Sequence, residues 1–175
     1  MKRSDFNWVI RAATEQDAEL FRDLRLEALR QHPEAFSSDY ETSAKWPLDK
    51  WKERLRGNDG VNSITYLACL DDVLIGMMGI SRASSAKIRH NGTIWGVYVR
   101  PSYRKQGVGQ GLIEACAKWA SQRGIEIIKL GVVSRNSAAI QLYTRGGFNV
   151  YGVEPRALRV NNRYYDELLM ARILQ

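Results

Sequence analysis

"IWGVYVRPSYRKQGVGQGLIEACAKWA", residues 94 to 120, is the stretch of sequence that decides the fold. It opens with β-branched and aromatic residues, which are typical of a strand, and this run ends at Pro101. Glycines then occupy every second position in "GVGQG", and apolar residues recur at helical spacing from Leu112 to Ala120. The stretch therefore predicts a strand, a glycine-rich loop and a helix in succession.

The glycine-rich segment resembles neither of two common phosphate-binding loops. A P-loop requires Gly-x-x-x-x-Gly-Lys-Ser/Thr, whereas Gln110 and Gly111 follow Gly109 here. A dinucleotide fingerprint requires Gly-x-Gly-x-x-Gly directly after the strand and an acidic residue that closes the next strand. Here residues 101–104 intervene, the glycine spacing differs, and Glu126 opens the next strand. Both interpretations are excluded.

A third pattern, Arg-x-x-Gly-x-Gly, fits Arg104, Gly107 and Gly109. The free N–H groups and the positive dipole end of the following helix attract an anion. Glycines leave those amides accessible, while Arg104 and Lys105 add positive charge. The pattern predicts an anion site, although a tight helix entry with exposed cations explains the same residues.

The rest of the chain predicts an α+β fold in which helices flank both faces of one mixed, mostly antiparallel sheet. No linker-like stretch divides the chain, so residues 1–175 are expected to form a single domain. The other expected elements are a strand over 8–14, a helix that begins after a Thr14 cap and ends near residue 32, a helix through Trp51 and Leu55, strands over 63–70 and 73–81 joined at Asp71-Asp72, a strand over 125–133, a helix over 136–145, and strands over 148–153 and 164–174.

The composition is that of an ordinary soluble domain, with 45% hydrophobic and 26% charged residues. The longest strongly apolar stretch, Val73 to Ile80, is too short to cross a membrane, and the N-terminal residues do not resemble a signal peptide. We therefore expect a cytoplasmic protein. A net charge of +7 favours an anionic ligand, but no like-charge run reaches five residues, so no nucleic-acid partner is expected.

The cysteine and histidine residues predict no metal site. Cys69 and Cys116 are isolated among apolar neighbours, which favours a role as small core residues. The two histidines, His32 and His90, do not complete a set of metal ligands at any usual spacing.

Residues 94–120, together with the later "SRNSAAIQLYTRGGF" over 134–148, resemble the GNAT family of N-acetyltransferases. The order of the expected elements is similar to that of the family. The resemblance implies an enzyme that uses acetyl-CoA as co-substrate and no metal. It would move the acetyl group from the thioester to a primary amine by direct transfer in a ternary complex. Homodimers are common in the family, so a dimer is possible.

The resemblance implies roles for individual residues. The N–H of Val99 would polarise the thioester carbonyl. Asn136 would contact the cofactor arm and Tyr143 would protonate the departing thiolate, although capping and packing, respectively, also explain these two residues. Trp95 and Trp119 are expected in the core. The backbone that would bind coenzyme A comprises Val97, Tyr98 and Val99, beside the pantetheine arm, and Arg104, Lys105, Gln106, Gly107, Val108 and Gly109, around the pyrophosphate.

The general base is not evident from the resemblance. Many members of the family place a glutamate on the strand before the glycine-rich loop, and residues 89–99 contain none. Glu41 and, as a second choice, His90 are the candidates for the catalytic base. Phe36 and Tyr40 are candidates to contact the acceptor. The acceptor itself stays open between a small amine, an amino-acid derivative and a protein N-terminus. The missing glutamate also leaves an alternative, a coenzyme A-binding sensor without useful turnover.

Overall fold

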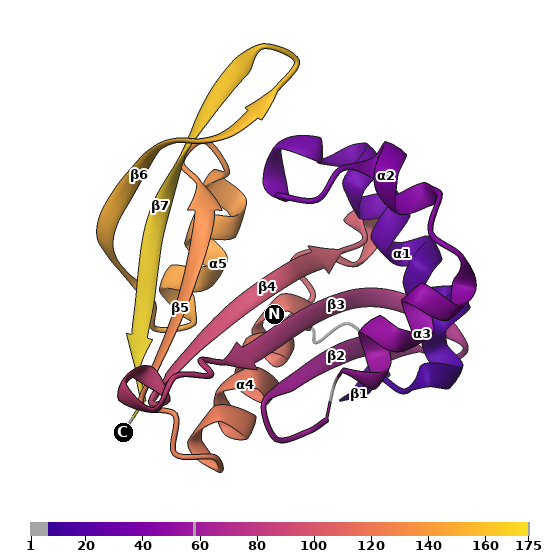
Figure 1. The fold of residues 1–175 in the computed structure, drawn as a ribbon, viewed down its shortest axis with the longest axis horizontal. Coiled ribbons are helices and arrows are strands. Elements are labelled where there is room, and N and C mark those ends of the chain that lie inside the picture. The colour runs from indigo at the N-terminus through magenta and orange to yellow at the C-terminus, as the bar shows by residue number, and fades with distance from the viewer. Residues whose placement is uncertain (1–6, 58, 175) are drawn as a thin grey trace.

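A computed structural model describes residues 7–57 and 59–174 of the chain, and its central feature is a seven-stranded sheet (Figure 1). The strands lie in the order β1-β2-β3-β4-β5-β7-β6, and each neighbouring pair is antiparallel except β4 and β5. The predicted mixed, mostly antiparallel sheet is confirmed. The strands are β1 (Val9–Ala12), β2 (Ser63–Leu70), β3 (Val73–Arg82), β4 (Asn91–Val99), β5 (Ile127–Val133), β6 (Asn149–Val160) and β7 (Arg163–Ile173).

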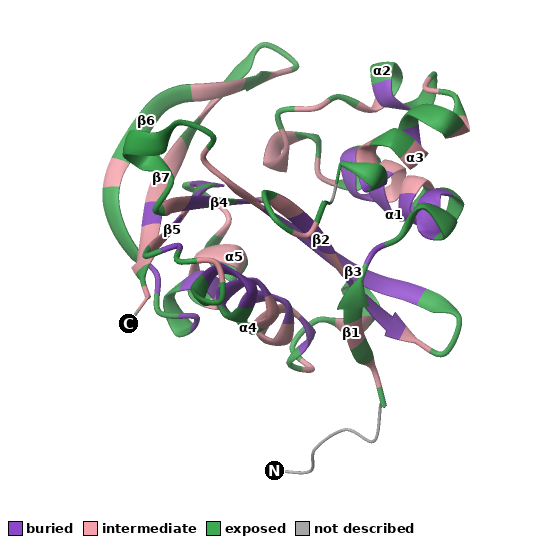
Figure 2. Cartoon of the chain, turned by 60° about the horizontal axis from the view of Figure 1, so that its bottom comes forward, coloured by how far each residue is buried: buried purple, intermediate pink, exposed green. Residues whose placement is uncertain are grey.

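Helices cover both faces of the sheet, as predicted. Apolar side chains of α4, such as Leu112 and Cys116, form one core cluster with one face, which we call the α4 face. Phe21 and Leu24 of α1 form the other cluster with the opposite face, which we call the α1 face. Figure 2 shows these buried helix surfaces turned toward the strands. The helices are α1 (Ala18–Gln31), α2 (Tyr40–Ala44), α3 (Leu48–Arg56), α4 (Val108–Ser121) and α5 (Ser137–Arg145).

The two parallel strands, β4 and β5, separate soon after they meet. In the described chain they pair only where residues 91–93 lie beside residues 127–129. Beyond that point the two strands diverge, as Figure 1 shows. The later residues of β4 therefore present an edge toward β5 that no strand formed by residues 7–57 or 59–174 covers. An extended ligand can pair with such an edge.

A β-bulge lies in β4 where the strand leaves β5. Gly79 of β3 pairs with Trp95, and Met77 pairs with Tyr98, so Gly96 and Val97 together stand opposite one residue of β3. Gly96 has a φ of +65°, a left-handed conformation that glycine adopts readily. Because a bulge bends its strand, Gly96 helps to open the gap between β4 and β5.

Two elements differ from the sequence prediction. Helix α2 was not expected: Asp39 caps it by accepting a hydrogen bond from the Thr42 N–H at 2.7 Å, and five residues are too few to show a helical period. Strand β6 continues beyond the predicted residue 153. Pro155 lies within a register shift between Glu154 and Leu158, and an irregularity of this kind tolerates a proline inside a strand.

Several smaller predictions are confirmed. Asp17 accepts hydrogen bonds from the Thr14 N–H and hydroxyl in the predicted cap, and Cys69, Cys116 and Trp119 are buried. Within residues 7–57 and 59–174, no helix combines the length and the apolar character that crossing a membrane requires.

Candidate active site

The glycine-rich loop connects the end of β4 to α4 in a conformation suited to anion binding. After a short 3₁₀ helix, η4 (Pro101–Tyr103), the chain adopts positive φ angles at Lys105 and Gly107. Gly107 is the N-cap of α4 with a φ of 86°. Because the first N–H groups of a helix have no intrahelical partners, those that follow Gly107 remain available to a ligand. The predicted strand, loop and helix are confirmed.

Two further glycines allow close contacts around this loop. A Cβ on Gly109 would lie 2.9 Å from Cδ2 of Leu142, so this glycine lets α5 approach the start of α4. A Cβ on Gly111 would lie 2.7 Å from Cδ1 of Ile10 in β1. Gly111 therefore serves the close packing of α4, and Gly109 places α5 beside the loop.

The Arg104 side chain turns back to the end of β4. Its Nε donates to the Val99 carbonyl at 2.9 Å, and its Nη2 lies 3.1 Å from Nε2 of His32. Lys105 is exposed, and the Gln106 amide donates to a backbone carbonyl of η4 at 3.0 Å. The positive field inside the loop therefore comes from backbone amides and the helix dipole, with Lys105 at the rim.

The end of β4 is fixed between the two helical layers. Val97 and Val99 pack toward the α4 face, whereas Tyr98 is buried on the α1 face. The Tyr98 hydroxyl donates to Glu27 Oε1 of α1 at 2.9 Å, and Arg100 forms an ion pair with Glu27 at 2.9 Å. Burial and this hydrogen bond raise the pKa of Tyr98 to about 12. Helix α1 thus holds the strand edge in position.

Asn136 and Tyr143 belong to the segment from the end of β5 into α5. Asn136 caps the helix, because its Oδ1 accepts from the Ala139 N–H at 3.1 Å. Tyr143 is buried, and its ring centroid lies 6.0 Å from that of Phe148. A tyrosine phenol is protonated at neutral pH, and burial raises the pKa of Tyr143 further. Both structural roles are confirmed, and both are compatible with the predicted contacts to a cofactor.

The other residues that the sequence suggests for catalysis or acceptor binding do not belong to the end of β4 or to the glycine-rich loop. His90 directly precedes β4, roughly 30 Å along an extended strand from Val99, which is too far to act on a group bound there. Phe36 packs against the Arg25 guanidinium, whereas Tyr40 packs against that of Arg30. Glu41 is exposed on α2.

Trp95 does not belong to either core cluster, which corrects the prediction that it is a core residue. It is half-buried, and its indole covers Gly79 so closely that a Cβ there would collide with the ring. The Arg54 guanidinium carbon lies 5.2 Å from the centroid of the Trp95 ring. The Trp95 side chain therefore lies on the α1 face beside the gap between β4 and β5, which we call the opening.

Arg25 lies beside the bulge on the same face. It is only 5% exposed, and its Nη1 would be 3.6 Å from a Cβ on Gly96. Its guanidinium carbon lies 4.4 Å from the centroid of the Phe36 ring. Burial and repulsion by Arg54 lower the pKa of Arg25 to about 10, so it remains charged at neutral pH. Burial also lowers the pKa of Arg54.

Glu167 of β7 lies across the opening, and the sequence analysis did not identify it. Its carboxylate lies over Gly131 of β5, where a Cβ would collide with it. Register places Val133 and Glu167 side by side, with Glu154 of β6 beyond, and this side of the strands is the α1 face. Burial and the neighbouring Glu154 raise the pKa of Glu167. A glycine inside strand β5 was the available sequence signal for such a close approach.

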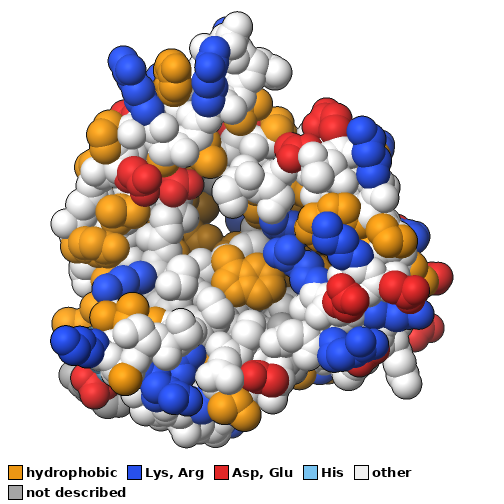
Figure 3. Space-filling view, in the orientation of Figure 1, with side chains coloured by type: hydrophobic (Ala, Val, Ile, Leu, Met, Phe, Trp, Pro, Cys, Tyr) orange, Lys and Arg blue, Asp and Glu red, His pale blue; other side chains and the backbone are white. Residues whose placement is uncertain are grey.

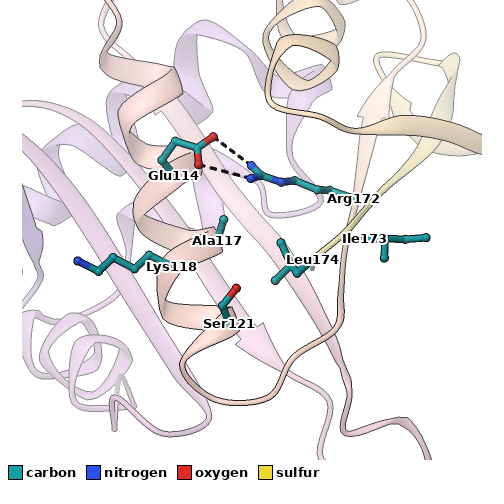
Figure 4. A pocket seen from close by; sticks show the side chains of 7 residues that line it. All are labelled: Glu114, Ala117, Lys118, Ser121, Arg172, Ile173 and Leu174. Atoms are coloured by element: carbon teal, nitrogen blue, oxygen red, sulfur yellow. Dashed lines mark hydrogen bonds and ion pairs between the residues drawn. The ribbon is translucent and has the colours of Figure 1, made fainter.

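Figure 3 shows this face of the molecule. A large apolar group lies near the centre of a hollow, with Lys and Arg side chains on the side of α1 and α3, and acidic side chains on the side of β6 and β7. A separate hollow of about 410 Å³ lies between the outer side of α4 and the end of β7 (Figure 4). An ion pair of 3.0 Å between Arg172 and Glu114 crosses it. That hollow includes no residue of the glycine-rich loop.

Comparison with known proteins agrees with this geometry. The family model described as "Acetyltransferase (GNAT) family" matches residues 21–148, which is most of the chain. The protein therefore belongs to the GNAT acetyltransferase family and is an N-acetyltransferase.

Individual relatives cover nearly the whole chain. The L-amino acid N-acetyltransferase AaaT of Escherichia coli (strain K12) is 28% identical over 170 residues, which are 94% of this chain and 97% of that protein. The structure of a GNAT acetyltransferase from Streptococcus pneumoniae is similar with a TM-score of 0.84 at 26% identity, covering 97% of this chain and 100% of that one. The acetyltransferase yncA from Salmonella typhimurium, solved with its cofactor acetyl-CoA, is similar in fold, with a TM-score of 0.82 at 20% identity over 96% of this chain and 94% of that one.

Proposed function

We propose that the protein is an acetyl-CoA-dependent enzyme that transfers the acetyl group directly to a primary amine in a ternary complex. The observation that carries this proposal is the uncovered edge of β4 leading straight into the glycine-rich loop at the start of α4. An extended pantetheine arm fits the first feature, and a pyrophosphate fits the second. The acetyl-CoA in the yncA structure supports the same choice of donor.

The alternation of the strand backbone supports the assignment of the oxyanion donor. The Arg100 N–H donates to the Ile75 carbonyl of β3 at 2.9 Å. Since N–H groups alternate between the two edges of a regular strand, the N–H of Val99 points to the open edge, whereas Val97 lies in the bulge, where this alternation is interrupted. We assign the Val99 N–H to the thioester oxygen and the backbone of Val97 to the pantetheine arm. Preorganised donors of this kind stabilise the charge of a tetrahedral intermediate.

The chemistry balances with residues of this chain alone. The neutral amine nitrogen attacks the thioester carbonyl carbon, and the Val99 N–H receives the oxygen that becomes negative. The C–S bond then breaks, and the coenzyme A thiolate takes a proton from the Tyr143 hydroxyl. The amine nitrogen loses its proton to a carboxylate base, and net transfer of one proton from that base to Tyr143 through solvent restores both groups. Asn136 retains the amide N–H groups that its capping role does not use, and we assign these to a carbonyl of the cofactor arm.

Two carboxylates are candidates to accept the proton of the amine. Glu41 on α2 is exposed, as a base that exchanges protons with solvent would be. Glu167 is half-buried on the α1 face, and its raised pKa brings it nearer to the working range of a general base. Glu41→Gln and Glu167→Gln separate the two, because loss of the base lowers kcat and removes the acidic limb of the pH profile.

The experiment that tests the proposed function combines binding and turnover. Acetyl-CoA at saturating concentration should raise the melting temperature, because it binds the native state. A panel of primary amines should then release coenzyme A thiol. Stabilisation without thiol release from any amine would favour a coenzyme A-binding sensor instead, and no stabilisation would exclude both.

The remaining expectations accompany this proposal. Residues 1–175 form one N-acetyltransferase domain, the protein acts in the cytoplasm without a metal, nucleic acid or membrane partner, and a homodimer is possible. The acceptor is a small amine or a protein N-terminus. The name of the relative AaaT, an L-amino acid N-acetyltransferase, supports the small acceptor.

A further inference from the structure

Two arginines on the α1 face have no acidic partner among residues 7–57 and 59–174. Arg25 of α1 is 5% exposed, and its Nη1 has no hydrogen-bond partner. Arg54 of α3 has a buried Nε without a partner. Arg54 lies over the ring of Trp95, and Arg25 lies against the bulge at Gly96, so both reach neighbouring residues of β4.

This arrangement is costly in the free protein. A buried charge normally has an opposite charge or a full set of hydrogen bonds, and these two cations also repel each other. The aromatic rings of Phe36 and Trp95 offset only part of that cost. An anion bound between the guanidinium groups would supply both the missing charge and the missing acceptors.

The phosphates of coenzyme A do not fit this position. The glycine-rich loop begins α4, which covers the opposite face of the sheet. The arginines belong to the helices of the α1 face, from which an acceptor can approach the opening between β4 and β5. An anion bound by the two arginines would therefore belong to the acceptor and would lie close to the group that reacts.

Resting on the acetyl transfer proposed above, we propose that Arg25 and Arg54 bind the carboxylate of a free amino acid, whose amine is the acetyl acceptor. Gly96 lies about 10 Å along the strand from Val99. A hydrogen bond of about 2.9 Å, one amino-acid length of about 3.6 Å and an attack distance of about 3 Å together span this interval. A peptide N-terminus has no α-carboxylate, because that group is part of the peptide bond.

The other side of the opening complements the amine. The 3₁₀ helix η2 (Pro33–Ala35) contacts β5 and β6, and the next residue, Phe36, lies under Arg25. This segment therefore bridges from the arginines to the strands next to Glu167. An amino acid whose carboxylate is bound by the two arginines can direct its ammonium group toward the Glu167 carboxylate. The ammonium group must lose a proton before the amine can attack, and Glu167 can accept it.

The test compares amino acids with their amides, which keep the amine and the side chain but lose the negative charge. The wild-type enzyme should show a kcat/KM at least tenfold higher for the free acids of a panel of L-amino acids than for the matching amides. Arg54→Gln should raise the KM for the acids at least tenfold and leave kcat/KM for the amides within threefold. Arg56→Gln, on the same helix but paired with Glu15 at 2.8 Å, is the matched control and should keep the preference.

Arg25→Met provides a second variant in case Arg54→Gln fails to fold. It should also abolish the preference for acids, while acetyl-CoA raises its melting temperature as in the wild type. Equal kcat/KM for acids and amides in the wild type, or an unchanged preference in both arginine variants, would overturn the carboxylate site and leave acetyl transfer intact. An enzyme that releases no thiol with any acid or amide overturns the proposed function as well, so the two failures are distinguishable.

Discussion

The Nε of Arg104 donates a hydrogen bond to the backbone carbonyl of Val99, with 2.9 Å between the two atoms. The N–H and the carbonyl of Val99 both face the open edge of β4, because the next residue, Arg100, donates its own N–H to β3. The first residue of the glycine-rich loop thus holds the residue assigned to the thioester oxygen. The Arg104 side chain therefore links the loop proposed to bind the pyrophosphate to the backbone proposed to bind the thioester carbonyl.

Arg104→Ala should therefore affect both binding and turnover. A hydrogen bond of this kind contributes about 1 kcal/mol, so the affinity for acetyl-CoA should fall about fivefold. The value of kcat should fall as well, because the Val99 peptide is then less well fixed. Lys105→Ala is the control, because within the described residues no hydrogen bond ties the Lys105 side chain to β4; it should weaken acetyl-CoA binding without lowering kcat. Calorimetry and steady-state kinetics measure the two effects, and equal kcat values in the two variants would contradict this role.

Gly107→Ala should weaken acetyl-CoA binding beyond its effect on stability. The φ of 86° at Gly107 disfavours any residue with a Cβ by about 1 kcal/mol, and relaxation of that strain would turn the cradle amides away from the phosphates. Gly124→Ala is a matched control, since Gly124 has a φ of +67° and nothing within 4 Å of a Cβ. Both variants should lose stability in thermal melts, but only Gly107→Ala should raise the Kd for acetyl-CoA, by about tenfold.

The local parts of this site could be predicted from sequence, and the long-range parts could not. The loop between β4 and α4 is continuous in the chain, so its glycines and the Asn136 cap appear as short patterns. The proposed acceptor side is built from α1, α3 and β7, which only the fold brings to one face. One signal was present, because Arg25 follows Phe21 by one helical turn and interrupts the buried face of α1 with a charge.

Tyr143→Phe should lower kcat about a hundredfold and change the KM for acetyl-CoA less than threefold. Phenylalanine lacks the hydroxyl proton that the thiolate would take, so the departure of coenzyme A is slower. The ring keeps its packing against Phe148. The melting temperature should change little. Tyr151→Phe, at an exposed position of β6, is the control for the substitution itself. A Tyr143→Phe enzyme with the wild-type kcat would assign Tyr143 to packing alone.

Glu167→Gln should stabilise the protein at neutral pH and not at low pH. The pKa of Glu167 is raised above 4.5 by burial and by Glu154, so the folded state favours the protonated form. The stability that this form contributes is complete below the unfolded pKa and is lost as the pH rises through the folded pKa. Thermal melts should show a gain of about 2 °C at pH 7 and none at pH 4.

The acidic groups around Glu167 provide the check on that pH dependence. Glu154 lies directly opposite it on β6, while its β5 neighbours, Gly131 and Val133, carry no charge. Glu154→Gln should therefore lower the pKa of Glu167 and shift the acidic limb of kcat/KM to lower pH. An acidic limb of kcat/KM that is lost in Glu41→Gln and kept in Glu167→Gln would assign the base to Glu41.

Arg25→Met should raise the melting temperature of the free protein and abolish the stabilisation that an amino acid confers. Desolvation of an unpaired cation costs several kcal/mol, and the Phe36 ring offsets about 1–2 kcal/mol, so an apolar chain of similar length should gain about 2–6 °C. Saturating amino acid should stabilise the wild type by mass action and leave the variant unchanged. Arg22→Met on the same helix, where Arg22 pairs with Asp23 at 3.0 Å near the surface, is the control and should shift the melting temperature by less than about 1 °C. A lower melting temperature for Arg25→Met would show that the folded chain already satisfies Arg25, and the case for an anion at that position would fail.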